Sequence, residues 1–400
     1  MSFEVFLGTY NASPWIHKTL MALENQTYKP FKVTIIDNAS SDNTVEIIQN
    51  IFETNKLTNK YRLIQNKNNI GPISTFMDRL NVFDSDWIFM VHQDDFYHEN
   101  HVEELVAAIK KSEPETSLVF SAMKRMDSDG REITSTPTIA TKISSNNRLE
   151  NFQLALQINP VNFPSCALKK SFLINLNTTR HTSAFNDTEL ILKLMCISDI
   201  KYVPSETMHY RIHQGNAHAI TNNDSNDFAT LIGLNELFHS DEFKKLMHEY
   251  SDQIDFKEFT RVINLALEIR ISNPNTRNIA LGLIAEALIR IFGYKKKDLV
   301  ELSLSAHTSL KLNKEQTIIK NLGNGSEFEL FDLKSMSDKT ELGSEGIEQF
   351  VKSRNLLISA FNSVPLRLRE TFFDRIFTSP FAKIFKRPFV QAWYFRGKSD

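Results

Sequence analysis

Residues 87–95, WIFMVHQDD, form an apolar run that passes directly into two adjacent carboxylates. Such a run, short and bounded by polar residues, is typical of a buried strand followed by a turn. Asp94 and Asp95 repel each other at a strand tip unless a cation or a set of hydrogen-bond donors compensates their charge. Hard divalent cations bind carboxylates together with phosphates, so one interpretation is a metal site. The other is a helix cap, because Asp95 precedes a helix predicted over residues 99–112.

The same succession of strand, turn and helix occurs three times before residue 87. Apolar runs predict strands at residues 3–7, 32–36 and 61–64, and an amphipathic helical pattern follows each polar turn. This alternation favours a mainly parallel, Rossmann-like α/β sheet that is covered on both faces. In such a sheet, ligands bind beyond the carboxyl ends of the strands. The residues at those positions are Thr9, Tyr10, Asn11, Asp37, Asn69 and the run His92-Gln93-Asp94-Asp95.

The second half of the chain has a different pattern. Apolar residues at helical spacing predict long helices at 256–271 and 278–292, and a polar stretch with several glycines at 321–345 predicts a linker. The sequence therefore predicts three parts: an α/β domain over residues 1–220, a helical domain over 221–320, and a linker with a tail over 321–400.

Composition excludes several classes of protein. The 400 residues carry 46 Lys and Arg against 48 Asp and Glu, and 41% of them are hydrophobic. A disordered chain is excluded, and the net charge of -2 argues against a nucleic-acid partner. Two cysteines, Cys166 and Cys196, are too few for a disulfide framework, and Cys166 is predicted to be a core residue. Without a predicted signal peptide or membrane span, we expect a cytoplasmic protein, either free or peripheral at the inner face of the cell membrane.

The last 36 residues are basic and aromatic. Residues 365–400 contain eight Lys or Arg and three Asp or Glu, a local charge of +5, which leaves -7 for the remainder. Phenylalanines recur every four residues at Phe373, Phe377, Phe381 and Phe385. Two interpretations stay open: this tail binds an anionic membrane surface, or it packs on the α/β domain or on a second copy in a homo-oligomer.

Four segments over about residues 1–215 together resemble the family 2 glycosyltransferases with the A-type fold. They are Thr9-Tyr10-Asn11, residues 35–44, Asn69-Ile70-Gly71 and residues 92–97. The resemblance implies that a nucleotide sugar is bound by Thr9, Tyr10, Asn11, Asp37, Asn69, Gly71, Gln93, Asp94 and Asp95. Within this set, Asp37 holds the nucleotide base and Asp94 binds the metal. This sequence departs from the family's Asp-x-Asp motif, because His92 stands at its first position.

Two later segments extend the resemblance. Residues 185–194 are similar to the family's acidic pair ahead of a helix, with Asn186 in place of the first acid. The second acid, Asp187, matches the catalytic base of the inverting enzymes, and a helix cap is its alternative role. Residues 210–216 resemble the closing segment whose histidine, here His213, binds the metal or the diphosphate. His92, His209 and His218 are assigned no role.

The resemblance implies an inverting glycosyltransferase that uses a divalent metal, Mg or Mn. The expected partners are a nucleoside diphosphate sugar donor and a glycan or lipid-linked acceptor, in bacterial surface polysaccharide, lipopolysaccharide or capsule synthesis. One alternative is a sugar-phosphate nucleotidyltransferase, although the glycine-rich loop with arginine that is typical of those enzymes does not follow residues 3–7. The other is a binding protein without catalysis, which the departures at His92 and Asn186 leave open.

Overall fold

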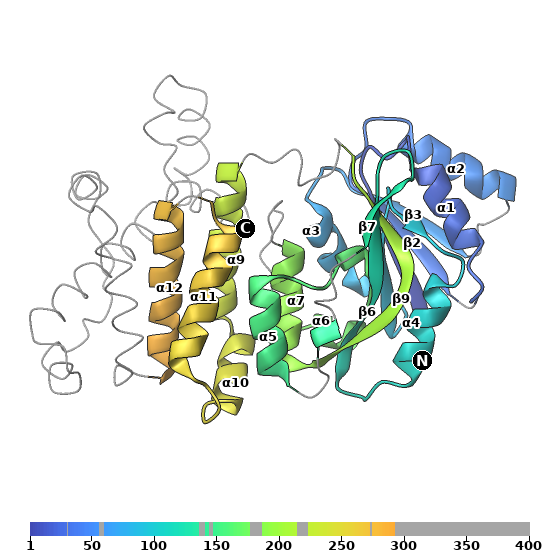
Figure 1. Ribbon diagram of the computed structural model, residues 1–400. Coiled ribbons are helices and arrows are strands. Elements are labelled where there is room, and N and C mark those ends of the chain that lie inside the picture. Colours follow the sequence, from blue (N-terminus) through green and yellow to red (C-terminus); the bar gives the residue numbers. More distant parts are fainter. Residues whose placement is uncertain are drawn as a thin grey trace, which may run out of the picture. The chain divides into compact units, whose positions relative to one another are not determined.

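Figure 1 shows a computed structural model of the chain, which divides into two compact units at residues 1–221 and 222–400. The predicted linker and basic aromatic tail, together with residues 214–222, lie outside the described residues. The structure describes residues 1–29, 31–55, 60–135, 141–143, 147–176, 186–213, 223–272 and 274–292.

The first unit is built on one sheet of nine strands among the described residues, in the order β3-β2-β1-β4-β8-β6-β9-β5, with β7 paired to β6. Strands β3, β2, β1, β4, β6 and β9 run in one direction, since β8 is antiparallel to both of its neighbours. The predicted α/β class with a mostly parallel sheet is therefore confirmed. The strands are β1 (Phe3–Thr9), β2 (Lys32–Asp37), β3 (Tyr61–Gln65), β4 (Trp87–His92), β5 (Phe96–Tyr97), β6 (Thr116–Met126), β7 (Glu132–Ser135), β8 (Cys166–Lys169) and β9 (Asp199–Arg211).

Helices cover the sheet, and α1 packs beside α2 while α5 packs beside α7 (Figure 1). Apolar residues of β1, β2 and β4 meet those of α1, α2 and α4 in a core where most side chains are fully buried. The helices of this unit are α1 (Ile16–Glu24), α2 (Thr44–Asn55), α3 (Pro72–Met77), α4 (His101–Lys110), α5 (Arg148–Gln157), α6 (Lys170–Leu173) and α7 (Asn186–Ile197).

The helix-cap interpretation of Asp95 is wrong. The short strand β5 follows Asp95 and pairs with β9, so α4 begins only at His101 and its cap position is Asn100. The predicted helix at 99–112 is otherwise present, two residues shorter at each end.

The second unit is helical over its described residues, as predicted. It consists of α9 (Asn223–His239), α10 (Asp241–Glu249), α11 (Phe256–Arg270) and α12 (Pro274–Phe292), and α12 begins four residues before its predicted start. Ser240 and Asp255 cap α10 and α11, because their side chains accept hydrogen bonds from backbone N–H groups of the first turn. Within the described part of the chain, every helix is too short or too polar to span a bilayer.

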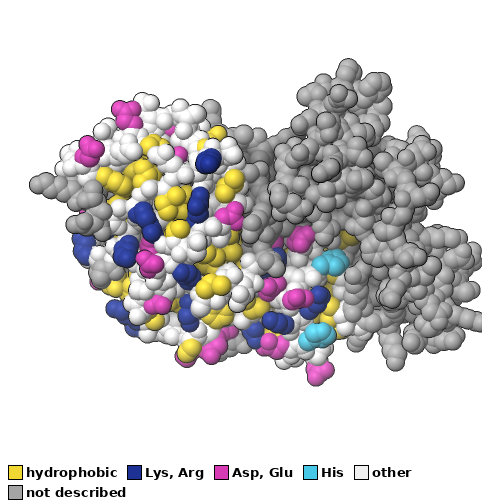
Figure 2. Space-filling model, turned by 180° about the vertical axis from the view of Figure 1, so that it is seen from behind, with side chains coloured by type: hydrophobic (Ala, Val, Ile, Leu, Met, Phe, Trp, Pro, Cys, Tyr) yellow, Lys and Arg dark blue, Asp and Glu magenta, His cyan; other side chains and the backbone are white. Residues whose placement is uncertain are grey.

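Basic, acidic and apolar side chains are mixed on one face of the described part of the chain. On the face shown in Figure 2, Lys and Arg alternate with Asp and Glu over the described residues, and no broad patch of one sign appears there. This distribution agrees with the near-neutral charge of the sequence.

His101 makes the stability of the first unit depend on pH. Its ring is 1% exposed, and Nδ1 lies 2.8 Å from Thr207 Oγ1 on β9. Burial, with a smaller effect of His98, lowers the pKa of His101 to about 3. The ordinary value is about 6.5, so between these two values the unfolded chain binds a proton that the folded chain does not.

We therefore predict that the free energy of unfolding falls as pH decreases from about 6.5 toward 3, by up to about 1.4 kcal/mol per pH unit from His101 alone. Urea unfolding of wild type and His101→Asn at pH 7, 6, 5 and 4 measures this, and the variant should show the shallower decline. His17→Asn, at an exposed position of α1, is the matched control and should follow wild type. Equal slopes for His101→Asn and wild type would contradict the prediction.

Candidate active site

Three strands of the sheet end side by side at its carboxyl edge. In register, Thr9 at the end of β1 pairs with Asp37 at the end of β2, and Gly8 pairs with His92 at the end of β4. The structure thus brings together the polar residues that follow these strands.

Asp37 is held by donors from two segments. Asp37 is 2% exposed. Its Oδ1 accepts hydrogen bonds from Thr9 Oγ1 at 3.0 Å and from Ser40 Oγ, and its Oδ2 accepts one from Ser40 N at 3.0 Å. The carboxylate is therefore fixed in place at this edge, and its predicted contact with a nucleotide base stays a prediction.

The loops at this edge hold unusual backbone conformations. Asn11 and Ala39 have φ of 49° and 65°, the left-handed region that residues with a Cβ rarely adopt. Hydrogen bonds join the two loops that contain these residues. Asn11 N donates to Ser40 Oγ, and Ser41 N donates to Asn11 Oδ1, both at 2.9 Å. Such strained positions cluster at functional sites, because the surrounding contacts must impose them.

Asn69 and Gly71 form the third loop of the edge. Asn69 Oδ1 accepts from Asn38 Nδ2 at 2.7 Å and from Gly71 N at 3.0 Å, which ties the end of β2 to the start of α3. Gly71 has φ 83° and ψ 159°, a conformation that is essentially restricted to glycine.

The acidic turn after β4 is bound to the end of β9. Asp95 is 3% exposed, and its Oδ1 accepts from Arg211 N at 2.9 Å. Arg211 also donates through Nε to the carbonyl oxygen of Asp94 at 2.9 Å. Burial and the charge of Asp94 raise the pKa of Asp95 well above its usual range. The second oxygen of this carboxylate, Oδ2, is buried and has no hydrogen-bond partner.

Three side chains of this turn can approach one ion. Donor atoms of His92, Asp94 and Asp95 all lie within 4.8 Å of one another, and His92 Nδ1 is 3.8 Å from Asp95 Oδ2. Asp94 Oδ2 is also 2.9 Å from Nε2 of His213. The structure therefore brings together the two residues predicted to bind metal, Asp94 and His213, and adds His92, to which the sequence assigned no role.

Gln93 contacts the main chain of the neighbouring strand end. Its Oε1 accepts from Tyr10 N at 2.7 Å, its Nε2 donates to Tyr10 O at 3.1 Å, and its own carbonyl accepts from Thr19 Oγ1 at 2.7 Å. These bonds fasten the loop after β1 to the turn after β4. The side chain of Tyr10 stays 44% exposed beside them.

Asp187 lies in the first turn of α7 rather than before it, and its Oδ1 accepts from Thr188 N at 2.6 Å. Burial, followed by the charges of Asp95, Asp94 and Asp187, raises the pKa of Tyr210 to about 12. Because all three carboxylates act on this one phenol, Asp187 lies within electrostatic range of the acidic turn.

The other acid in the first turn of α7, Glu189, forms an ion pair with Lys193. Its side chain is 0% exposed and its Oε1 lies 2.7 Å from Lys193 Nζ one helical turn later. Asp187 is only half-buried, so it is the acid of this turn that a substrate can reach. Cys166 is buried on β8, as predicted, and burial raises the pKa of its thiol, which opposes a role as nucleophile.

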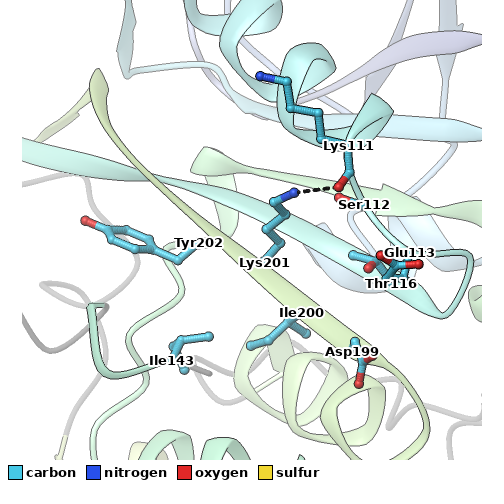
Figure 3. A pocket seen from close by; sticks show the side chains of 9 residues that line it. All are labelled: Lys111, Ser112, Glu113, Thr116, Ile143, Asp199, Ile200, Lys201 and Tyr202. Carbon is cyan, nitrogen blue, oxygen red and sulfur yellow. Dashed lines mark hydrogen bonds between the residues drawn. The ribbon is translucent and has the colours of Figure 1, made fainter. Parts of the chain in front are cut away.

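A separate hollow lies at the opposite edge of the sheet, where β6 and β9 begin and α4 ends (Figure 3). Lys201, which lines this hollow, donates through Nζ to the carbonyl oxygens of Lys111 at 3.0 Å and Ala108 at 3.3 Å. The hollow does not contain the paired carboxylates, so we place the candidate active site at the carboxyl edge. The lining residues are Lys111, Ser112, Glu113, Thr116, Ile143, Asp199, Ile200, Lys201 and Tyr202.

Sequence reasoning missed two residues that shape the site. Arg211 joins both aspartates of the turn, and Trp15 lies against Arg211 and His213. The sequence around Trp15 indicates only a helix start. Trp15 contacts residues almost 200 positions away in the sequence, and the periodicity of apolar residues does not reveal contacts over such a separation.

Known proteins resemble this chain in sequence and in fold. The model of the family described as glycosyl transferase family 2 matches residues 4–176. An uncharacterized glycosyltransferase of Haemophilus influenzae is 26% identical over 114 residues, 28% of this chain and 34% of that protein. An uncharacterized glycosyltransferase of Mycoplasma pneumoniae is 30% identical over 115 residues, 28% of this chain and 38% of that protein. The matched region thus spans little more than a third of either relative.

Among solved structures, residues 1–349 of S. aureus TarS in complex with UDP-GlcNAc superpose with a TM-score of 0.53 at 15% identity. This match covers 83% of the present chain and 95% of that one. A longer TarS structure gives a TM-score of 0.50 at 17% identity over 83% and 57% of the two chains. This likeness concerns the fold. The family model covers β1, β2, β3 and β4 with the turns that follow them, whereas Asp187, Arg211 and His213 lie beyond its residues. Residues 4–176 of the chain are therefore similar to glycosyl transferase family 2.

Proposed function

We propose that this protein is an inverting glycosyltransferase that moves a sugar from a nucleoside diphosphate donor to an acceptor hydroxyl. The observation that carries the proposal is the meeting of Asp94, Asp95 and His213 at one sheet edge with Asp187 in electrostatic range. A leaving diphosphate needs its growing negative charge stabilised, and an attacking hydroxyl needs a base. The match of residues 4–176 to the family model and the likeness in fold support the same function.

The residues at the acidic turn fit a divalent cation. The buried Oδ2 of Asp95 has no hydrogen-bond partner, and a cation would satisfy it. The 2.9 Å between Asp94 Oδ2 and His213 Nε2 is close to the roughly 3 Å that separates adjacent ligands of an octahedral Mg²⁺ with bonds of about 2.0–2.1 Å. Asp94 and His213 would hold the ion, with Asp95 and His92 beside them. When bound, Mg²⁺ or Mn²⁺ acts as a Lewis acid toward the leaving diphosphate.

Residues of this chain account for the remaining steps. Asp37, Asn69 and the loop of Tyr10 and Asn11 bind and orient the nucleotide. Asp187 accepts the proton of the acceptor hydroxyl while the oxygen of that hydroxyl bonds to the anomeric carbon. In the same step, the bond from the anomeric carbon to the diphosphate oxygen breaks. A single displacement of this kind inverts the anomeric centre. The acceptor is a glycan or a lipid-linked acceptor in bacterial surface polysaccharide synthesis. The basic aromatic tail at 365–400 would bring the cytoplasmic enzyme to the membrane that holds a lipid-linked acceptor.

The function is tested by donor binding and turnover. UDP, GDP and TDP sugars are screened by thermal shift with and without Mn²⁺, and a CMP sugar, which has one phosphate, serves as the control. A diphosphate sugar that stabilises the fold only with Mn²⁺ supports the proposal.

For that donor, Asp187→Asn should lower the rate of donor hydrolysis, measured as nucleotide released, about 10²–10⁴-fold. The variant should keep the thermal shift, because the base is lost and donor binding is not. Asp94→Ala should abolish the Mn²⁺-dependent shift.

The matched control for these variants is Asp129→Asn, at an exposed carboxylate, which should behave as wild type. Proton NMR of the released sugar reports inversion at the anomeric carbon. Full turnover by Asp187→Asn, or retention of configuration, would rule out the assigned base.

We predict that Asp95 lowers the stability of the metal-free protein and strengthens metal binding. Asp95→Asn removes a charge that burial and Asp94 oppose, and it keeps an oxygen for Arg211 N. In EDTA we expect the variant to be more stable than wild type by about 1 kcal/mol, or about 2–4 °C in unfolding midpoint. The further rise caused by Mn²⁺ should be smaller than in wild type. A midpoint lowered in EDTA would contradict this prediction.

Membrane binding by the tail is tested in the full-length chain by replacing Lys383, Lys386 and Arg387 together with Gln. Co-sedimentation with vesicles containing phosphatidylglycerol should weaken at least tenfold, since each basic residue near an anionic surface contributes about 1 kcal/mol. Vesicles of pure phosphatidylcholine should bind neither protein. If the variant still sediments like wild type, the tail does not act through charge. The control replaces three lysines with exposed side chains in the first unit: Lys32, Lys67 and Lys110.

A further inference from the structure

Trp15 occupies a fixed position between β1 and α1. It is the residue before the first turn of α1, and its backbone N–H donates to Ala12 O at 2.9 Å. Ala12 in turn donates to Thr44 Oγ1 at 2.7 Å. The half-buried indole therefore projects from backbone that is anchored to α2.

Two side chains from the end of β9 lie against this indole. The guanidinium carbon of Arg211 is 4.7 Å from the ring centroid, within the range of a cation–π contact. The ring of His213 has its centroid 5.4 Å from that of Trp15, at an interplanar angle of 35°. Residues two apart in an extended chain point to the same side, which explains why Arg211 and His213 both reach Trp15.

Both of these side chains hold Asp94. Arg211 Nε donates to the Asp94 carbonyl oxygen, and His213 Nε2 lies 2.9 Å from Asp94 Oδ2. The side chains of His213 and Asp94 are only 14% and 15% exposed. Trp15 thus contacts both groups that fix the position of this aspartate.

We propose that Trp15 is a positioning residue that orients His213 so that His213 and Asp94 can bind one divalent cation together. This inference rests on the function proposed above. An imidazole must be turned with its nitrogen toward the ion before it can ligate, and a residue that fixes this rotation raises metal affinity without touching the metal. Loss of such an outer partner typically weakens metal binding about 10–100-fold.

A role in packing alone makes a different prediction. If Trp15 only stabilised the fold, its loss and the loss of His213 would weaken metal binding independently and the two effects would add. If Trp15 acts through His213, its loss has no further effect once His213 is gone. A double-mutant cycle separates these cases.

The experiment measures Mn²⁺ affinity of the full-length chain by titration calorimetry, with saturating amounts of the nucleoside diphosphate that the donor screen identifies. The variants are Trp15→Leu, Trp15→Phe, His213→Ala, the double variant Trp15→Leu with His213→Ala, and Asp94→Ala. Trp87→Phe is the control, because Trp87 is a buried tryptophan at the start of β4, away from the turn. Trp15→Met replaces Trp15→Leu if circular dichroism shows that the latter is unfolded.

We expect Trp15→Leu to weaken Mn²⁺ binding about tenfold, and Trp15→Phe to restore most of the affinity because it keeps an aromatic face. The double variant should bind as weakly as His213→Ala alone, and Trp87→Phe should match wild type. Unchanged affinity in Trp15→Leu, or additive losses in the double variant, overturns the inference while Asp94→Ala still confirms the metal site. If wild type binds no Mn²⁺, or Asp94→Ala binds it equally well, the metal site of the proposed function fails and this inference fails with it.

Discussion

Two adjacent carboxylates at the tip of a buried strand are tolerated here because Arg211 meets them from another strand. Strand β8 pairs only with the start of β4, at Trp87–Phe89, so it does not extend to the end of β4. Three residues, 93–95, lead from the end of β4 to β5, which pairs with β9. Arg211 holds these three residues by its backbone N–H to Asp95 and its guanidinium to the Asp94 carbonyl. The position of the acidic turn is thus set by the pairing of β5 with β9.

The neighbouring loops are fixed by side chains that bond to backbone. Gln93 fastens the loop after β1, Ser40 joins Asp37 to Asn11, and Asn69 joins β2 to α3. These bonds satisfy the backbone N–H groups of Tyr10, Asn11 and Ser40, which follow the strand ends, whereas Asn69 bonds to the side chain of Asn38. This bonding also explains how Ala39 is kept in the left-handed region, which it would leave if the loop were free. A preorganised edge of this kind suits a site that must hold a charged ligand in one orientation.

Much of the fold could be predicted from the sequence, because strand and helix periodicity is local. The buried run of 87–91 indicated β4, and the general rule for parallel sheets placed the candidate site residues at the carboxyl edge. Asp95 shows where local reasoning fails. Its spacing from the next helix fitted a cap, but the two-residue strand β5, which pairs with β9 more than 100 positions away, has too short a pattern to detect. Trp15 and Arg211 were missed for the same reason, since they meet each other and the acidic turn from segments far apart in the sequence.

Three acidic side chains act on one phenol at this edge of the sheet. Asp94, Asp95 and Asp187 all raise the pKa of Tyr210, and Asp95 is itself shifted by its neighbour. Glu189, by contrast, is matched by Lys193 within its own helix and adds no such strain. Asp94 and Asp95 are adjacent, and repulsion between neighbouring carboxylates opposes folding. Under the proposed function, a divalent cation at this turn would relieve that repulsion and would satisfy the buried Oδ2 of Asp95, so the contacts that cost stability would favour metal binding.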